Sequence, residues 1–192
     1  MPGEADRVKH QLAEEKMEYT GAELRSHFIR DRFGIEGDAI VAFRGECRVS
    51  GERLVDQEDF EAGETVWGDD MMHFIVEIFG IGLPHVTAVQ RLLCAAAKDV
   101  VDSAAGQLAV ERRGDDLFVG SGKLSVSVAT VSPVSGLIHM GLNVTAEGVP
   151  VEAACLKDLG LEPDKIALEV IQKFVEEVDS VDHATHKVRP VD

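Results

Sequence analysis

Residues 117–144, LFVGSGKLSVSVATVSPVSGLIHMGLNV, decide the fold, because apolar and polar residues alternate along much of this stretch. A period of two indicates β-strands. We expect strands over 108–110, 117–119, 124–131 and 137–144, joined by short turns at Gly114, at 120–122 and at Ser132-Pro133. Because short links join antiparallel neighbours, these strands predict an antiparallel meander.

One amphipathic helix is predicted before the meander in the sequence and one after it. From Pro84 to Val100 and from Pro163 to Val178, apolar residues recur at spacings of three and four, which gives each helix one buried face. The order of helices and strands along the chain favours the α+β fold class, in which helices back a mostly antiparallel sheet.

The first half of the chain carries weaker signals. Thr20 and Glu23 have the spacing of a capping box, so we expect a helix that ends at Gly34. A short apolar run predicts a buried strand over 39–43, an acidic stretch predicts a surface loop over 51–68, and a short helix is expected over 69–80. Residues 1–17 are polar. We expect them to form a solvated helix or frayed N-terminal extension, followed by a single domain over 18–192.

The composition of the 192 residues excludes several classes of protein. The chain has 35 acidic and 19 basic side chains and a formal net charge of −16, so it lacks the wide basic face of a nucleic-acid binder. No apolar run reaches the ~18 residues of a membrane span, and the N-terminus lacks the apolar core of a signal peptide. Three scattered cysteines fit a reducing compartment. We therefore expect a cytoplasmic protein without nucleic-acid or membrane partners.

Strand alternation sorts the meander into two faces. Apolar residues at 138, 140, 142 and 144 share one face. If helices cover it, the opposite face presents polar side chains around a glycine. These residues are Lys123, Ser125, Ser127, His139, Gly141 and Asn143. Glycine within a strand often marks the close approach of a ligand or another backbone, so we expect a small-molecule groove here. A solvated sheet face is the alternative.

Lys123 follows the tight turn at 120–122. A lysine there is suited to bind a carboxylate or phosphate as a point charge, or to polarise a carbonyl. The alternative is an ordinary surface lysine at the start of a strand. No metal site is expected, because His183 and His186 with Asp182 lack a third strong ligand.

Two segments resemble known enzymes. Residues 113–125 (RGDDLFVGSGKLS) resemble the catalytic-lysine stretch of lipoate–protein ligases, and residues 139–144 (HMGLNV) resemble a strand of lipoyl and octanoyl transferases. The chain from Glu18 to Val191 is similar to the family called domain of unknown function 366, through residues 21–28, 38–45, 113–119 and 187–191. That family is grouped with the biotin and lipoate ligase catalytic domains, which are related to class II aminoacyl-tRNA synthetases. The resemblance implies that α+β fold.

The resemblance also implies roles for individual residues. Lys123 would contact the acyl carbonyl or its adenylate, with Asp116 as its acidic partner and His139 and Asn143 lining the site. Ser125 and Gly141 lie beside them in the sequence. The ligases' glycine-rich loop is absent from this sequence, and Val126 stands where the ligases have glycine. Both departures weaken the case for adenylate chemistry and leave ATP as an open question.

Two further candidates come from more distant similarity. Residues 43–46 (FRGE) resemble motif two of the class II synthetases, in which Arg44 would hold an α-phosphate; a strand-end ion pair is the alternative. The octanoyltransferases use a lysine with a cysteine, and Cys155 lies eleven residues past Val144. Cys155 is therefore a candidate nucleophile for a thioester. A small buried hydrophobe is the alternative.

The sequence leaves two functions open. The first is an acyl-group ligase or acyltransferase of the lipoate- or octanoate-handling type, acting on a small molecule or an acyl carrier. The second is a non-catalytic binding or interaction protein that keeps the ligase fold. A closed apolar tunnel ending at Lys123 would favour the first, and an open face would favour the second. The identity of the substrate and the oligomeric state do not follow from the sequence.

Overall fold

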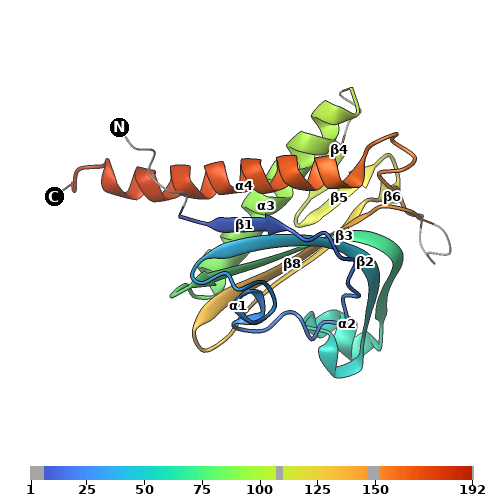
Figure 1. Cartoon of the computed structure of the whole chain (residues 1–192), viewed down its shortest axis with the longest axis horizontal. Coiled ribbons are helices and arrows are strands. Elements are labelled where there is room, and N and C mark those ends of the chain that lie inside the picture. The colour runs from blue at the N-terminus through green and yellow to red at the C-terminus, as the bar shows by residue number, and fades with distance from the viewer. Residues whose placement is uncertain (1–6, 107–109, 147–151, 192) are drawn as a thin grey trace.

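The computed structural model describes residues 7–106, 110–146 and 152–191, and shows one large sheet and one small sheet packed against helices (Figure 1). The large sheet has the strand order β1-β2-β3-β8-β7. Its strands are β1 (Lys9–Leu12), β2 (Ala39–Ser50), β3 (Thr65–Phe79), β7 (Ser125–Val131) and β8 (Ser135–Asn143). Every neighbouring pair is antiparallel except β1 with β2. The α+β fold class with a mostly antiparallel sheet is confirmed.

The remaining elements cover this sheet or extend it. The small sheet has the order β4-β5-β6, formed by Val110–Arg113, Asp116–Val119 and Gly122–Lys123. The helices are α1 (Phe28–Phe33), α2 (Gln57–Ala62), α3 (Leu83–Ala104) and α4 (Pro163–His186), with a short 3-10 turn η1 at Gly51–Arg53. Among the described residues, no helix combines the length and the apolar character needed to cross a membrane.

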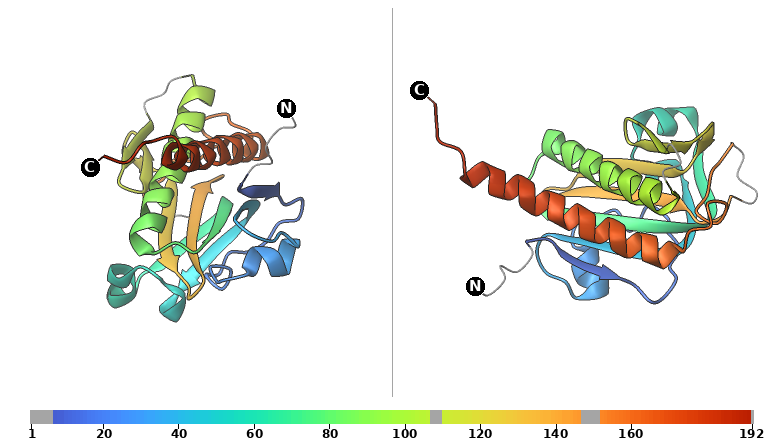
Figure 2. Two further views of the ribbon diagram at one scale, coloured as in Figure 1. Left: turned by 90° about the vertical axis from the view of Figure 1, so that its left-hand side faces the viewer. Right: turned by 90° about the horizontal axis from the view of Figure 1, so that it is seen from above.

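Helices α3 and α4 pack on one face of the large sheet and bury the main core. Figure 2 shows them lying side by side across that face. Phe74 of β3 and Met140 of β8 meet Leu93 of α3 and Phe174 of α4 in one apolar cluster. Burying such a side chain stabilises the fold by roughly 1.5–3 kcal/mol. Both predicted amphipathic helices are confirmed, because each one buries a single face.

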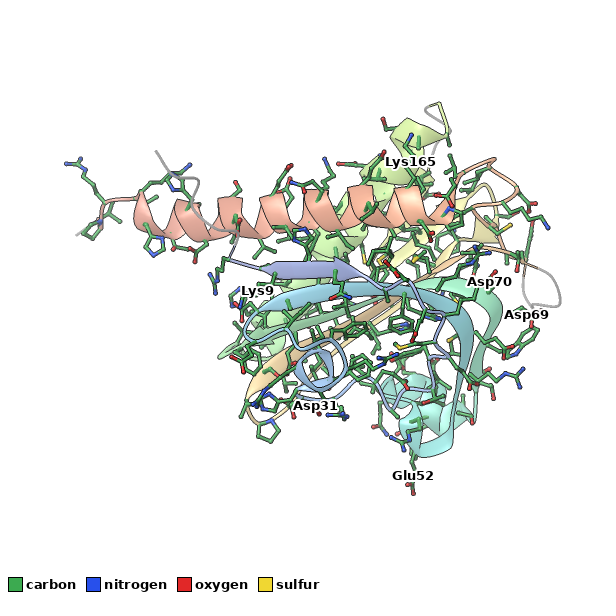
Figure 3. All side chains as sticks on the ribbon, in the orientation of Figure 1. Lys9, Asp31, Glu52, Asp69, Asp70 and Lys165 are labelled. Carbon is green, nitrogen blue, oxygen red and sulfur yellow. The ribbon has the colours of Figure 1, made fainter. Side chains whose placement is uncertain are left out.

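The opposite face of the sheet is covered by the chain between β1 and β2 and by the tip of the β2–β3 hairpin. Tyr19, Phe28 and Ile29 pack there against Phe43 and Ile75 in a second apolar cluster. Figure 1 shows α1 and α2 on this side, away from α4, and Figure 3 places Glu52 at the hairpin tip. This face is therefore covered by loops and short helices rather than exposed to water.

The helix expected over 69–80 is wrong, because residues 69–79 belong to β3. Strand β3 lies between β2 and β8 and is buried on both faces. Met72 and Phe74 belong to the cluster under the helices, whereas Met71 and Ile75 belong to the cluster on the other face (adjacent positions 71 and 72 thus enter different layers). A strand buried on both sides is apolar at nearly every position, so a helical spacing can be found within it by chance.

The helix expected from Thr20 begins only at Phe28. The capping contact itself is present, since the backbone N–H of Thr20 donates to Glu23 Oε2 over 2.8 Å. Left-handed backbone at Gly21 (φ 85°) and at His27 (φ 62°) prevents a continuous helix between them. The predicted end at Gly34 is confirmed.

Two other expectations for the first half are corrected. The loop expected over 51–68 contains η1, helix α2 and the start of β3. Asp56 caps α2 by accepting from the N–H groups of Glu58 and Asp59.

The N-terminal segment also differs from expectation. Lys9–Leu12 form an edge strand paired with β2, and Val8 is fully buried. A solvated helix or frayed extension is therefore wrong for this part, and residues 1–6 lie outside the described residues.

Candidate functional site

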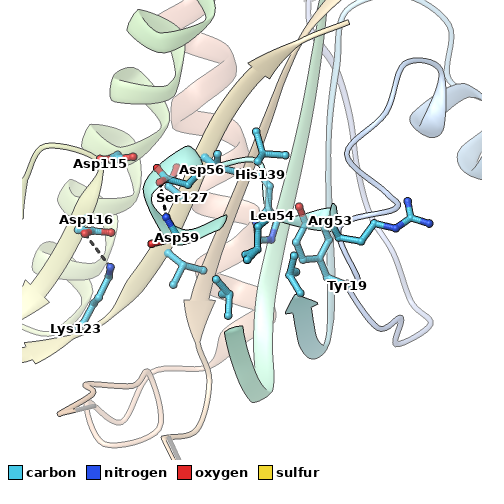
Figure 4. Close-up of a pocket in the computed structure, with 15 residues that line it drawn as sticks. Tyr19, Arg53, Leu54, Asp56, Asp59, Asp115, Asp116, Lys123, Ser127 and His139 are labelled. Carbon is cyan, nitrogen blue, oxygen red and sulfur yellow. Dashed lines mark hydrogen bonds and ion pairs between the residues drawn. The ribbon is translucent and has the colours of Figure 1, made fainter. Parts of the chain in front are cut away.

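A groove of about 270 Å³ opens between β7, β8, the β5–β6 hairpin and the tip of the β2–β3 hairpin. Figure 4 shows its labelled lining residues, which come from both halves of the chain. The charged and polar lining consists of Tyr19, Arg53, Asp56, Asp59, Asp115, Asp116, Lys123, Ser127 and His139. A second hollow shares Asp59, Val66, Lys123 and Val126 with the groove and extends to Trp67, Met71 and Asn143. Lys123 thus contributes to both spaces.

The backbone of Lys123 is held from two sides. Its N–H donates to the carbonyl of Glu152 over 3.0 Å, and its carbonyl accepts from the N–H of Ala154 over 3.0 Å. The preceding Gly122 allows this close crossing, because a Cβ there would lie 2.8 Å from the nitrogen of Ala154. The lysine is therefore fixed at its Cα, and its side chain contributes to the lining of the groove.

The side chain of Lys123 pairs with Asp116 on the neighbouring strand β5. Nζ of Lys123 lies 2.9 Å from Oδ2 of Asp116, and the two side chains are 36 % and 30 % exposed. Figure 4 shows this pair at one side of the groove. The sequence therefore identified two residues that lie together. The ammonium group of Lys123 balances the charge on Asp116, and it remains partly exposed.

Asn143 holds the backbone of the Lys123 segment through its side-chain amide. Its Nδ2 donates to the carbonyls of Lys123 (3.0 Å) and Ala154 (3.1 Å). It lines the second hollow. Both donors of the amide are used on backbone, so in this structure Asn143 positions the Lys123 segment rather than offering a free donor to a ligand.

Ser125 and Ser127 do not share a face with His139, and this expectation is wrong. Opposite residues of an antiparallel pair point the same way, and the register pairs Ser127 with Met140 and Val128 with His139. Oγ of Ser125 accepts from the N–H of Leu117, and Oγ of Ser127 accepts from Nε2 of Gln90 on α3. Alternation separates the two faces of each strand, but it does not determine which faces of neighbouring strands coincide. Ser127 still reaches the rim of the groove.

Gly141 faces protein rather than an open site. A Cβ added there would lie 2.8 Å from Cε of Met71 and 3.3 Å from Cγ2 of Val126. Glycine is needed at this position because side chains from both neighbouring strands fill the space above it. The contact to a ligand expected here is replaced by packing.

Arg44 lies on the other face of the sheet. It pairs in the β2–β3 register with Met72, which belongs to the core under the helices. Its Nε and Nη2 donate to Oδ1 and Oδ2 of Asp70 over 2.8 and 2.5 Å, and this bond raises the pKa of the guanidinium. Figure 3 shows Asp70 at the end of the molecule where α4 begins. The ion-pair alternative holds, and the structure does not bring Arg44 to Lys123.

Cys155 is also outside the site. Its side chain is buried, and burial raises the pKa of its thiol. It is not among the described residues that line the groove or the second hollow. The thiol is therefore protonated at neutral pH and hidden, which fits the alternative of a small buried hydrophobe.

Sequence reasoning named His139, which lines the groove, but missed the buried His73 that contacts it. Nδ1 of His73 on β3 lies 3.0 Å from Nε2 of His139 on β8, and Nε2 of His73 lies 3.2 Å from the carbonyl oxygen of Gly45. The ring of Tyr19 stacks on His139 with centroids 3.6 Å apart and planes 11° apart. Period-two alternation along β3, which places Met71, His73 and Ile75 on one face, is the signal that would have found His73.

Burial keeps both histidines uncharged at neutral pH. It lowers the pKa of His73 to about 4 and lowers the pKa of His139 below its ordinary value, with the neighbouring His73 adding to the effect. Burial likewise raises the pKa of the Tyr19 phenol. Within the described part of the chain, no group of three or more His, Cys, Asp or Glu side chains is placed to hold a metal ion.

The fold of this molecule is similar to the fold of the biotin and lipoate protein ligases. A putative lipoate protein ligase of T. acidophilum, solved with bound lipoic acid, has a TM-score of 0.62 at 13% identity over 90% of this chain and 86% of that chain. A biotin protein ligase of Aquifex aeolicus (a point mutant, solved with biotin) has a TM-score of 0.58 at 9% identity over 89% and 70%. These similarities concern the fold.

The chain belongs to the family described as domain of unknown function 366, whose model matches residues 8–189. An uncharacterised protein of Methanocaldococcus jannaschii is 33% identical over 187 residues, which cover 94% of this chain and 84% of that protein. A solved protein of unknown function from Pyrococcus horikoshi is 39% identical with a TM-score of 0.91, over 96% of this chain and all of that one.

Proposed function

We propose that this protein binds the acyl group of a small molecule in the groove and holds its carbonyl or carboxylate oxygen at Lys123. The observation that carries the proposal is the Lys123 ammonium, fixed through its backbone and 2.9 Å from Asp116 where the groove and the second hollow meet. A cation placed there stabilises negative charge that develops on a carbonyl oxygen during nucleophilic attack. Lipoic acid and biotin, named for the solved ligases of the same fold, are carboxylic acids of suitable size.

The charges of the groove favour an acyl donor that is already activated, rather than activation by ATP. The lining contains two cations, Arg53 and Lys123, against four aspartates. Arg44, the other candidate for a phosphate contact, is bound to Asp70 on the far face. The residues present do not fit a triphosphate, because its negative charge would meet these carboxylates.

The corresponding reaction is transfer from a thioester. An acceptor amine or hydroxyl attacks the carbonyl carbon while Lys123 stabilises the oxygen, the new C–N or C–O bond forms, and the C–S bond breaks. The thiol leaves with the proton that the acceptor loses. Cys155 takes no part in this route.

A second candidate function, ligand binding without catalysis, is favoured by one observation. The groove is lined by both polar and apolar side chains, and it is not a closed apolar tunnel ending at Lys123. Binding without chemical turnover fits such a site.

The two candidates are separated by following thiol release from the N-acetylcysteamine thioesters of octanoic acid and biotin in the presence and absence of a small amine, together with binding of octanoic acid, lipoic acid and biotin by calorimetry. The test variant is Lys123→Met, which keeps an unbranched side chain only one atom shorter and removes its charge. The matched control is Lys165→Met on α4, where the lysine is exposed.

We expect the wild-type protein and Lys165→Met to release thiol, and Lys123→Met to do so at least about tenfold more slowly, the loss that follows from one stabilising contact of about 1.4 kcal/mol. Binding that depends on Lys123 without thiol release would support the second candidate. If none of the acids and no thioester binds, or if Lys123→Met behaves as wild type, the proposal is wrong.

A further inference from the structure

The two buried histidines form a chain of hydrogen bonds with a defined direction. The carbonyl oxygen of Gly45 only accepts, so Nε2 of His73 must carry the proton that it donates. Nδ1 of the neutral His73 ring is then an acceptor, and Nε2 of His139 donates to it over 3.0 Å. The backbone carbonyl of Gly45 thereby selects the tautomer of both rings.

This chain leaves Nδ1 of His139 without a proton and without a protein partner. Among the described residues, no group donates to this nitrogen. Among the described residues, Oδ1 of Asp179 is the one side-chain nitrogen or oxygen that is both fully buried and unpaired. Because Nδ1 of His139 is also unpaired, it must retain some exposed surface. His139 contributes to the lining of the groove. Its lone pair is therefore accessible from the cavity.

The stacked ring of Tyr19 holds His139 in this orientation. The two ring centroids lie 3.6 Å apart, and both side chains are 3 % exposed. The groove thus has a rigid acceptor that already has the geometry needed to meet a donor, so no side-chain freedom is lost when a ligand binds.

Figure 4 shows His139 and Tyr19 away from Lys123 across the groove, with the carboxylates of Asp56 and Asp59 among the lining side chains. An oxyanion near His139 would meet a lone pair and two carboxylates, and an alkyl end would leave the nitrogen unsatisfied. An N–H or O–H group is the chemical partner that satisfies it.

We propose that Nδ1 of His139 binds an N–H or O–H donor on the ligand, and that His73 is the positioning residue that fixes the tautomer for this contact. The preferred ligand class is then an acyl compound whose far end carries amide, urea or hydroxyl donors rather than a plain alkyl chain. The placement of the acyl end at Lys123 rests on the proposed function. The acceptor at His139 does not.

The test uses protein labelled with ¹⁵N at histidine, long-range ¹H–¹⁵N spectra at neutral pH, and two small probes of similar ring size. 2-Imidazolidinone is a cyclic urea with two N–H donors, and cyclopentanone keeps the ring and carbonyl without them. We expect Nδ1 of His139 to be unprotonated, and its resonance to move several-fold more with the cyclic urea than with cyclopentanone. Exposed His85 serves as the internal control and moves with neither probe.

Variants of His73 separate positioning from general structural support. His73→Gln offers an amide oxygen that can accept from Nε2 of His139, so we expect it to keep the response to the cyclic urea. His73→Phe removes the acceptor, so His139 becomes a mixture of tautomers and the response falls by at least half. Unchanged spectra of the backbone confirm that both variants fold.

Three outcomes overturn the inference: a protonated Nδ1 of His139 in the free protein, an equal or absent response to the two probes, or an unchanged response in His73→Phe. Because the probes carry no acyl group and the readout does not involve Lys123, such a failure is distinct from failure of the proposed function. An active Lys123 with an unresponsive His139 would reject this inference alone.

Discussion

His73 links the groove to the stability of the whole protein, because its burial changes how strongly the folded chain binds protons. Burial lowers the pKa of His73 to about 4, whereas the unfolded chain takes up this proton at an ordinary histidine pKa of about 6.5. The stability that comes from the neutral ring is therefore present above that ordinary pKa and is lost as the pH falls toward about 4.

We predict that acidification from about pH 7 to about pH 4.5 lowers the free energy of unfolding by an amount that includes a histidine contribution of up to about 3 kcal/mol. Urea unfolding at both pH values measures it. His73→Gln should reduce the difference between the two pH values, and the exposed His85→Gln should not. Equal pH dependence in His73→Gln and wild type would show that His73 is not held neutral by burial.

Asn143 is a second residue with a consequence for both fold and site. Its two hydrogen bonds to the carbonyls of Lys123 and Ala154 join β8 to the strand that carries the lysine. We predict that Asn143→Ala lowers the free energy of unfolding by about 1–3 kcal/mol and weakens ligand binding at Lys123. Denaturant unfolding and calorimetry measure the two effects. Gln172→Ala, which removes an exposed bond on α4, should change stability by less than about 0.5 kcal/mol.

At the scale of the elements, the backbone of the N-terminal segment at Met17 crosses β2 at Gly45, beside the bulge of that strand. A Cβ at Gly45 would lie 1.8 Å from the carbonyl oxygen of Met17, and the same glycine's carbonyl holds His73. Only glycine permits the two backbones to approach this closely, so the position of Tyr19 over His139 depends on this crossing.

We predict that Gly45→Ala lowers the free energy of unfolding by at least about 1–3 kcal/mol and displaces Tyr19 from His139. Thermal unfolding and the histidine spectra described above measure these effects. Gly82→Ala is the control, since its Cβ would meet nothing closer than 4.0 Å. A stable Gly45→Ala protein with an unshifted His139 signal would show that the crossing is not needed.

The elements that sequence patterns predicted are those in which apolar residues recur with a clear period. Helices α3 and α4 each bury one apolar face. Strand β8 is buried on both faces, but His139, Gly141 and Asn143 alternate with apolar residues, so its period of two is visible in the sequence. Strand β3 is apolar on both sides and was mistaken for a helix. That error concealed His73. The register between β7 and β8 also required the structure, because it depends on the length and shape of the turn between them.

At the scale of the whole molecule, the groove forms where segments distant in sequence meet. Lys123 and Asp116 lie on adjacent strands of a hairpin, so similarity to known enzymes was enough to pair them. Tyr19, Arg53 and Asp59 come from irregular segments and a hairpin tip. No period governs such segments, and their place over the sheet follows from tertiary packing alone. The fold was therefore more predictable than the site.

Binding of the acyl group at Lys123 is tested most directly by a crystal structure of the protein with a non-hydrolysable analogue of an acyl thioester, such as a biotinyl thioether ketone of N-acetylcysteamine. We expect the ketone oxygen to lie within hydrogen-bonding distance of Nζ of Lys123, with the acyl chain in the groove that runs toward His139. An analogue bound elsewhere, or bound in the groove with its carbonyl away from Lys123, would show that Lys123 does not hold the acyl group.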